Sequence, residues 1–271
     1  MMPVGMIAPL RPVPTLKQII TGLSLPTPNV VLDAGDPASY TSGNTWTDVQ
    51  SANNFYRGDD GSGFGGFPQF EGAVGALTGA FAMSSVTRSL FRATGAWTFA
   101  EAWHKNNGAF TLAALVYVPS LASGSGAFLF STCDGATSSV GMRARYLDSV
   151  SGMRLDLKVS KGSGGYSLDT YADMAPGLVE GSWNFVAIAI DEAVGSNGLT
   201  FHCNGQNVQA TSTYSSPSAA ASSGPYDVSG PIAGTSGNKI KMFAGWSSRL
   251  STTQLGNLYA QIKQDRQFDL P

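Results

Sequence analysis

The stretch that decides the fold is Ser182–Thr211, SWNFVAIAIDEAVGSNGLTFHCNGQNVQAT. Its first part, Ser182–Asp191, is apolar at nearly every central position, which predicts a strand covered on both faces. Apolar and polar residues then alternate along Leu199–Asn204, and Asn204-Gly205 favours a type I′ turn because both central turn positions need positive φ. The stretch therefore predicts a buried strand followed by a β-hairpin.

The turn and the hydrophobic pattern predict the same pairing of the two hairpin strands. A two-residue loop places the apolar residues of both strands on one face, and a shift by one residue would separate them. The expected cross-strand partners are Cys203 with Gln206, Phe201 with Val208, and Leu199 with Ala210.

The composition favours an all-β protein. Charged residues make up 13% of the 271-residue chain, about half of the usual ~25%. The chain holds 33 glycines, and a glycine-rich, charge-poor sequence with short apolar runs is typical of many strands and turns. The net charge of −2 comes with no basic block, so we expect no binding to nucleic acid or to an anionic membrane surface.

Several features bear on where the protein is made. No apolar run approaches the ~18 residues of a membrane-spanning helix, so no membrane insertion is expected. The start of the sequence lacks the pattern of a secretion signal. Two cysteines, Cys133 and Cys203, are too few for a disulfide framework, and we favour free buried thiols over a pair. We expect assembly in a cytoplasm.

The first 28 residues, Met1–Pro28, differ from the rest because they hold six of the 14 prolines. Proline removes backbone donors and favours extended chain, so we expect an arm at 1–28 and one domain at 29–271. Within the arm, Thr15–Leu23 can form one or two helical turns with one apolar side. Two interpretations stay open, packing on the same domain and docking on a partner. The residues assigned to docking are Pro9, Pro12, Pro14, Leu16, Ile19, Ile20 and Leu23.

The rest of the chain predicts further strands and one helix. The helix begins after Ser251, which forms a capping box with Gln254. A long Ser/Ala/Gly/Pro segment, Ser212–Gly237, is expected to be a surface loop. Strands are expected at Asn29–Ala34, Asn53–Arg57, Pro68–Gly72, Phe110–Val118, Ala127–Thr132, Val140–Leu147, Gly152–Val159, Tyr166–Tyr171 and Lys239–Trp246, with weaker candidates at Phe81–Val86 and Ala96–Ala100.

Motifs that could bind nucleotides or metals find little support. Gly61–Gly66 matches a dinucleotide-binding pattern, but an extended segment follows it instead of a helix. The two histidines, His104 and His202, lack neighbours at metal-ligand spacing. No catalytic residue and no metal ligand is assigned. Calcium stays a weak alternative, with oxygens from Asp59-Asp60 or from Asp33 and Asp36.

Carboxylates and aromatic residues decide between a glycosidase and a glycan-binding protein. Glycosidases usually need two carboxyl groups about 5–9.5 Å apart, and none of the four glutamates (Glu71, Glu101, Glu180 and Glu192) shares a strand with another. Aromatic rings on a sheet or loop can stack on sugar rings, although most are core anchors. The candidate glycan-binding residues are Trp103, Tyr166, Tyr171, Tyr214 and His202.

Several stretches together resemble the laminin-G-like branch of the concanavalin A-like lectin/glucanase superfamily. The resemblance covers about Asn29 to Phe268 and implies an antiparallel jelly-roll β-sandwich with a short C-terminal helix. The glucanase strand with Glu-x-Asp-x-(x)-Glu has no match here, so no catalytic residue is carried over. The stretches that carry the resemblance are Val30–Asp48, Phe67–Gly72, FTLAALVYVP, SWNFVAIAID, FHCNGQNV and Lys241–Tyr259.

The opening phrase LDAGDPASY (Leu32–Tyr40) with its following Trp-Thr-Asp resembles domains of bacteriophage virion proteins. This resemblance implies a non-enzymatic structural protein of a phage-like particle, attached by its arm to other virion proteins and touching host-surface glycan. It also implies a homotrimer as one assembly. The alternatives are a stand-alone lectin and, less favoured, a glycoside hydrolase that uses Glu71 or Glu101.

Overall fold

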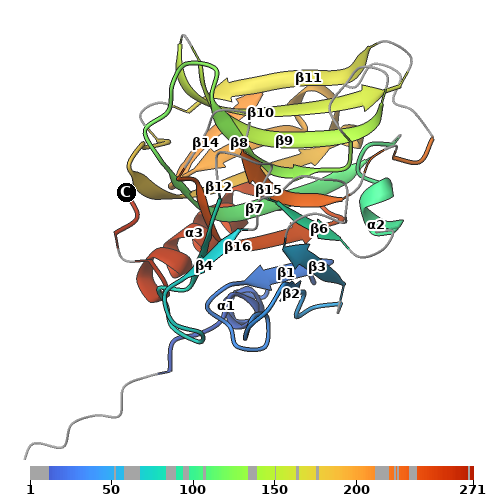
Figure 1. Ribbon diagram of the computed structural model, residues 1–271. Coiled ribbons are helices and arrows are strands. Elements are labelled where there is room, and N and C mark those ends of the chain that lie inside the picture. Colours follow the sequence, from blue (N-terminus) through green and yellow to red (C-terminus); the bar gives the residue numbers. More distant parts are fainter. Residues whose placement is uncertain are drawn as a thin grey trace, which may run out of the picture.

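The computed structural model (Figure 1) is a sandwich of two antiparallel sheets, each of eight strands. It describes residues 12–51, 53–57, 68–83, 90–93, 98–105, 108–133, 139–149, 151–162, 165–174, 177–210, 220–222, 224, 226–231, 237–267 and 269–271.

Sheet A has the strand order β14-β13-β12-β7-β16-β5-β4. Strand β1 lies outside this order and pairs with β16. The strands of sheet A are β1 (Val30–Asp33), β4 (Gln69–Glu71), β5 (Ala80–Ala82), β7 (Ala109–Val118), β12 (Ser182–Asp191), β13 (Leu199–Cys203), β14 (Gln206–Ala210) and β16 (Lys239–Trp246).

Sheet B has the order β11-β10-β9-β8-β15-β6-β3-β2. Its strands are β2 (Thr45–Thr47), β3 (Asn54–Arg57), β6 (Phe91–Ala93), β8 (Gly126–Ser131), β9 (Val140–Ser149), β10 (Gly152–Lys161), β11 (Tyr166–Asp173) and β15 (Asp227–Pro231). The described helices are α1 (Leu16–Gly22), α2 (Thr98–Glu101), the 3-10 helix η1 (Glu192–Asn197) and α3 (Thr252–Asp265).

The predicted hairpin is confirmed in its register. Strands β13 and β14 pair Leu199 with Ala210 and Cys203 with Gln206. The turn residues Asn204 and Gly205 have φ of 46° and 85°, as a type I′ turn requires. Strand β12 lies between β7 and β13, and its continuous apolar run reflects the burial of both its faces.

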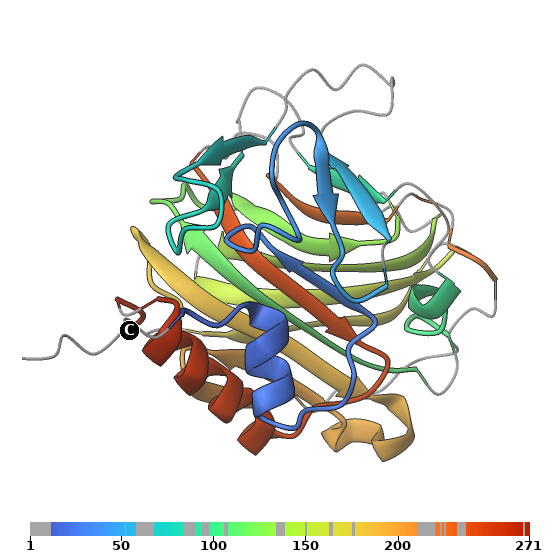
Figure 2. The ribbon, with the colours of Figure 1, turned by 90° about the horizontal axis from the view of Figure 1, so that it is seen from below.

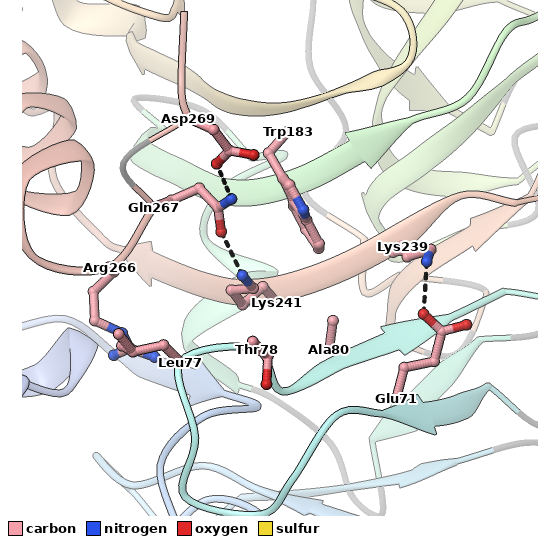
Figure 3. Close-up of a pocket in the computed structure, with 10 residues that line it drawn as sticks. All are labelled: Glu71, Leu77, Thr78, Ala80, Trp183, Lys239, Lys241, Arg266, Gln267 and Asp269. Carbon is pink, nitrogen blue, oxygen red and sulfur yellow. Dashed lines mark hydrogen bonds and ion pairs between the residues drawn. The ribbon is translucent and has the colours of Figure 1, made fainter.

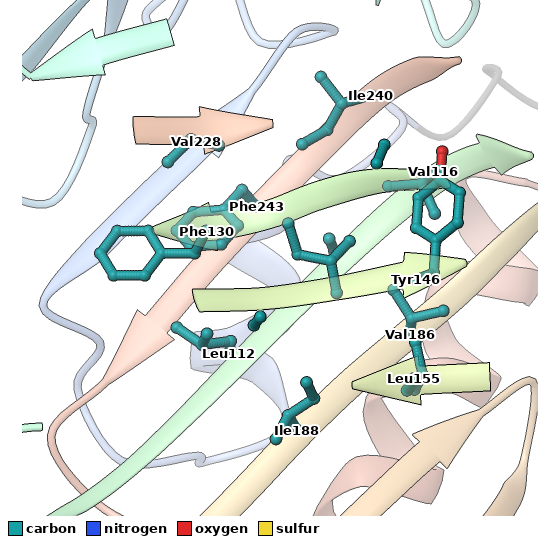
Figure 4. Packing of buried hydrophobic residues seen from close by; sticks show 14 of the residues in the cluster. Leu112, Val116, Phe130, Tyr146, Leu155, Val186, Ile188, Val228, Ile240 and Phe243 are labelled. Atoms are coloured by element: carbon teal, nitrogen blue, oxygen red, sulfur yellow. The ribbon is translucent and has the colours of Figure 1, made fainter. Parts of the chain in front are cut away.

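The main core fills the space between the two sheets (Figure 4). Val186 and Ile188 of β12 point into it, together with Leu155 of β10. The rings of Phe130 and Phe243, one from each sheet, stack with centroids 5.8 Å apart. Burying each such side chain contributes about 1.5–3 kcal/mol.

A second apolar layer covers the outer face of sheet A. Helices α1 and α3 lie side by side on this face (Figure 2), and together they bury its residues in one cluster. Strand β12 contributes Phe185, Ala187 and Ala189 to this cluster. The two alanines let the helices approach the sheet closely. Both faces of β12 are therefore dry, as its sequence predicts.

Helix α1 belongs to the sandwich, which corrects the predicted division at Pro28 and Asn29. The side chains of Leu16, Ile19 and Ile20 are 2–3% exposed and pack in the same cluster as α3. They are unavailable to a partner, so the prediction that they dock on one is wrong, and the alternative of packing on the same domain holds. Of the other docking residues, Leu23 packs partly buried on this cluster, Pro14 is partly buried, Pro12 is exposed and Pro9 lies outside the described residues.

Deleting residues 1–28 is therefore expected to destabilise the fold. Truncating a single buried Leu or Ile to alanine costs about 2–5 kcal/mol, and α1 buries three such side chains. We expect the free energy of unfolding, measured by urea denaturation, to fall by more than about 3 kcal/mol. A deletion of residues 1–11 keeps all of α1 and serves as the control. Equal stability of the two deletions would show that α1 is dispensable.

Other predictions differ in detail. Strand β15 lies inside the segment expected to be a loop, and the short strands β2 and β6 were not predicted. The weak strand candidate at Ala96–Ala100 is wrong, since α2 begins at Thr98. Both cysteines are free and buried, as favoured, and burial raises the pKa of the Cys203 thiol. None of the described helices combines the length and apolar character needed to cross a membrane.

Candidate functional site

The candidate site is an open pocket of about 520 Å³ beside the C-terminal end of α3, on the outer face of sheet A (Figure 3). This volume lies within the range of small-molecule sites. It is lined by Glu71, Leu77, Thr78, Ala80, Trp183, Lys239, Lys241, Arg266, Gln267 and Asp269.

Trp183 provides the aromatic surface of the pocket. It lies near the start of β12 on the outer face of sheet A, opposite Tyr117 of β7. The two rings meet edge to face with centroids 5.8 Å apart, which holds the indole in place. The indole is only partly buried, because the helices that cover the rest of this face stop short of it.

A β-bulge turns Lys241 into the pocket. The pairing of β16 with β7 shifts between Ile240 and Met242, which leaves Lys241 as the extra residue. A bulge breaks the alternation of a strand, so Lys241 and Met242 can face the same side. The Lys241 ammonium lies 4.4 Å from the centroid of the Trp183 ring and donates to the side-chain carbonyl of Gln267.

Burial of Lys241 lowers the pKa of its ammonium group from 10.5 to about 8. Desolvation is the largest cause, the nearby Arg266 adds to it, and Asp269 and Asp33 oppose it. Around neutral pH the group is a charged donor next to an aromatic ring. Above pH 8 it becomes a neutral amine.

A second lysine, Lys239, stands at the other end of the pocket. Its ammonium makes an ion pair with Glu71 of β4 at 2.6 Å and lies 5.5 Å from the centroid of the Tyr117 ring. Glu71 is about half exposed, so the pair is screened by solvent and contributes little to stability. Both groups remain accessible to a ligand.

The chain beyond α3 completes the pocket. Gln267 accepts from Lys241 and donates to Asp269. Arg266 is almost fully buried and binds both oxygens of Asp33 at 2.7 and 2.8 Å. The Nε of Arg266 has no hydrogen-bond partner among the described residues. The pocket thus combines one aromatic surface with ammonium, amide and carboxylate groups.

Two of the predicted glycan-binding residues are buried, and their assignment is wrong. Trp103 is fully buried, stacks on Phe110 at 5.5 Å and donates its indole N–H to the hydroxyl of Ser247. His202 is fully buried, with Asn207 at hydrogen-bond distance and the ring of Tyr259 from α3 beside it. Burial lowers the pKa of His202, which keeps its ring neutral.

The three tyrosines predicted to bind glycan do not line the pocket or lie outside the described residues. Tyr166 and Tyr171 lie on β11, the edge strand of sheet B, and do not line the pocket. Tyr171 is 53% exposed. Tyr214 lies outside the described residues. A role of these tyrosines in glycan binding stays a prediction.

Asp33 and Asp36, the calcium candidates among the described residues, already accept hydrogen bonds from protein groups and are poorly arranged to bind a cation. Both oxygens of Asp33 accept from Arg266, and one also accepts from the backbone N–H of Leu16. Asp36 accepts from the N–H of Ala38. In the part of the chain that the structure describes, no group of three or more His, Cys, Asp and Glu could hold a metal ion. Asp59 and Asp60 lie outside it.

The two glutamates proposed for hydrolysis are held by different partners. Glu71 lines the pocket and pairs with Lys239, whereas Glu101 of α2 accepts from Tyr226 and Ser222. Burial raises the pKa of Glu101, but the hydrogen bonds from Tyr226 and Ser222 outweigh it and leave the pKa below its usual value. Glu101 is therefore poorly suited to donate a proton.

Titration of Lys241 is expected to change stability with pH. Its pKa is about 8 in the folded chain and near 10.4 when unfolded, so between these values the unfolded chain binds more protons. Stability relative to a Lys241→Met variant should therefore rise from pH 8 to pH 10, by up to about 3 kcal/mol. Urea denaturation at several pH values measures it.

Lys239→Met is the matched control, since this partly exposed lysine lies on the same strand. The idea fails if the wild type and Lys241→Met show the same dependence of stability on pH between 8 and 10.

Sequence reasoning missed the main residues of the pocket. Trp183 starts a strand that the sequence predicts to be covered on both faces, and nothing in that strand shows where the helices end. Lys239 and Lys241 interrupt the apolar strand KIKMFAGW, and two lysines in a central strand were a signal that could have been followed.

The jelly-roll sandwich with a polar, aromatic-lined pocket defines a lectin-like class of protein. The sequence model of the concanavalin A-like lectin/glucanases superfamily matches residues 91–252, more than half of the chain. The protein belongs to this superfamily, as the resemblance implied. No curated protein matches its sequence.

Solved structures share the fold at low identity. The botulinum neurotoxin type G receptor-binding domain has a TM-score of 0.54 and 13% identity, over 87% of this chain and 51% of that one. The binding domain of botulinum neurotoxin DC in complex with SialylT has a TM-score of 0.55 and 12% identity, over 87% and 52%. A Trypanosoma rangeli sialidase in complex with 2,3-difluorosialic acid has 0.53 and 13%, over 88% and 33%. The chain thus spans about half of the toxin chains and a third of the sialidase.

Proposed function

We propose that the protein is a carbohydrate-binding domain whose pocket holds a sugar ring against Trp183. The observation that carries this proposal is the partly exposed indole in a pocket whose other lining residues are mostly polar or charged. A sugar ring presents C–H groups on its faces and hydroxyl groups around its edge. The indole suits the faces, and side chains such as Lys239, Glu71 and Gln267 suit the hydroxyls.

The similar structures support a ligand of this class. One of the toxin binding domains is in complex with SialylT, and the sialidase is in complex with 2,3-difluorosialic acid. Because the chain spans only part of those proteins, their activities do not transfer to it. What supports the proposal is the occurrence of the same fold in proteins that contact carbohydrate.

We propose a binding role without catalysis. Glycoside hydrolysis usually needs two carboxyl groups that flank the bond, one of them protonated. Of the two carboxylates that line the pocket, Glu71 is ion-paired with Lys239 and Asp269 accepts from Gln267, and Glu101 does not line the pocket. A glycoside hydrolase remains the less favoured alternative, and loss of activity on a glucan in a Glu71→Gln variant would revive it.

The setting proposed from the sequence is a phage-like particle, with a stand-alone lectin as the alternative. Because α1 is packed on the sandwich, residues 1–14 are the part of the predicted arm that could attach to other virion proteins. The trimer stays a prediction. Mass spectrometry of purified particles tests the setting: the full chain should be incorporated and a deletion of residues 1–11 should not.

A glycan array tests the proposed binding. We expect saturable binding of the purified protein to at least one glycan, and loss of that binding in Trp183→Ala. Binding that survives the substitution would place the site elsewhere. Absence of binding to every glycan of a broad array would contradict the proposal.

A further inference from the structure

The outer face of sheet B differs from that of sheet A in being built from charged side chains. On β9 and β10 the residues facing away from the core include Arg143, Arg145, Arg154 and Lys158. The pairing places Arg145 opposite Asp156, Arg143 opposite Lys158, and Arg154 one row further along. We call these four cations the arginine face.

The carboxylates of the arginine face are already engaged. Asp156 is 1% exposed, binds Arg145 through both oxygens at 2.9 and 3.3 Å, and lies 3.9 Å from Arg154. Asp169 pairs with Lys158 at 2.7 Å. One buried carboxylate thus stands between several cations, so positive charge is in excess around it. Asp173, exposed opposite Arg154 at the end of β11, offsets part of this excess.

Two guanidinium groups keep unused donors. Among the described residues, Arg143 makes no hydrogen bond or ion pair, and Arg154 makes no hydrogen bond. The Nε atoms of both are buried from solvent and unpaired. A ligand cannot reach these Nε atoms, so an anion would bind through the terminal nitrogens of the two partly exposed side chains. Guanidinium groups suit carboxylate and sulfate because they donate two parallel hydrogen bonds.

Exposed aromatic rings share this face of sheet B, and Tyr171 stands directly beside one of the cations. The two tyrosines that are 53% exposed, Tyr56 and Tyr171, both lie on this face of sheet B. Arg154 lies 4.6 Å from the centroid of the Tyr171 ring, and Phe128 of β8 stands partly exposed opposite Arg145. Rings beside cations across several strands can contact the repeating units of a polymer.

We propose that the arginine face binds an acidic polysaccharide, whose carboxylate or sulfate groups contact Arg143 and Arg154 and whose sugar rings contact Tyr171. The family to which the chain belongs, which includes lectins and glucanases, favours a sugar polymer over a nucleic acid. This site is separate from the pocket, which lies on the outer face of the other sheet.

Immobilised heparin is the probe, with neutral dextran as its uncharged counterpart. The wild type should bind heparin, not dextran, with an affinity that falls as salt rises. The double variant Arg143→Gln/Arg154→Gln should lose at least tenfold in affinity, and Tyr171→Ala should lose several-fold. The control Lys17→Gln/Lys263→Gln removes the same charge from α1 and α3 and should retain binding, as should Trp183→Ala.

Three outcomes would overturn the proposal. The first is absence of heparin binding by the wild type. The second is an equal loss in both double variants at unchanged melting temperature, which would show a non-specific charge effect. The third is equally tight, arginine-dependent binding of duplex DNA, which would make the ligand a nucleic acid. Loss of binding to the array glycan in Trp183→Ala tests the pocket alone and does not bear on the arginine face.

Discussion

Replacing Asp33 with alanine is expected to lower the free energy of unfolding by about 3–5 kcal/mol. Asp33 is fully buried and binds both terminal nitrogens of Arg266, which is itself almost fully buried. It also accepts from the backbone N–H groups of Leu16 and Gly35. The substitution leaves a buried cation and two backbone donors unpaired, and it disconnects α1, β1 and the end of α3. Urea denaturation measures the loss.

The double variant Asp33→Leu/Arg266→Met separates charge from packing. Removing both charges is often close to neutral in proteins, because the cost of burying them disappears as well. We therefore expect the double variant to be more stable than Asp33→Ala. A loss below about 1 kcal/mol in Asp33→Ala would mean that the ion pair is not buried in solution.

Replacing Trp183 with alanine is expected to weaken glycan binding about ten- to hundredfold. Truncation of an aromatic anchor at a binding site costs about 2 kcal/mol or more, and 1.4 kcal/mol corresponds to a factor of ten. The indole is the aromatic surface that the pocket offers, and the neighbouring ammonium of Lys241 would remain. Isothermal titration with a glycan identified on the array measures the change.

Two variants accompany this measurement. Trp183→Phe keeps a smaller ring and should recover part of the affinity. Tyr171→Ala removes an exposed ring from sheet B and should leave binding in the pocket unchanged. If Tyr171→Ala weakens this binding and Trp183→Ala does not, the site for the array glycan lies on sheet B and not in the pocket.

Local sequence was sufficient to predict the conformation of those segments in which neighbouring residues determine it. The Asn204-Gly205 turn needs positive φ at two successive positions, and few residues other than Asn and Gly adopt it at low cost. The capping box of Ser251 and Gln254 satisfies its donors within three residues. The strands of the hairpin follow from their period of two. These signals act over short distances and so remain readable in a single sequence.

The pocket illustrates what local sequence could not show. Glu71, Trp183, Lys241 and Gln267 come from four distant parts of the chain. The bulge that turns Lys241 outward results from the pairing of β16 with β7. His202 shows the same limit, because its alternating strand cannot reveal that α3 covers the outer face.

By itself, the sequence of Ser182–Thr211 determined an antiparallel sandwich strand, its hairpin and their register, because turn chemistry and hydrophobic period both act between near neighbours. Only the tertiary structure decided that α1 packs on the sandwich, that Trp183 stays partly exposed and that Arg143 and Arg154 make no hydrogen bond with another described residue. The physical reason is that burial and ion pairing depend on which distant segments meet, and this follows from the packing of the whole chain.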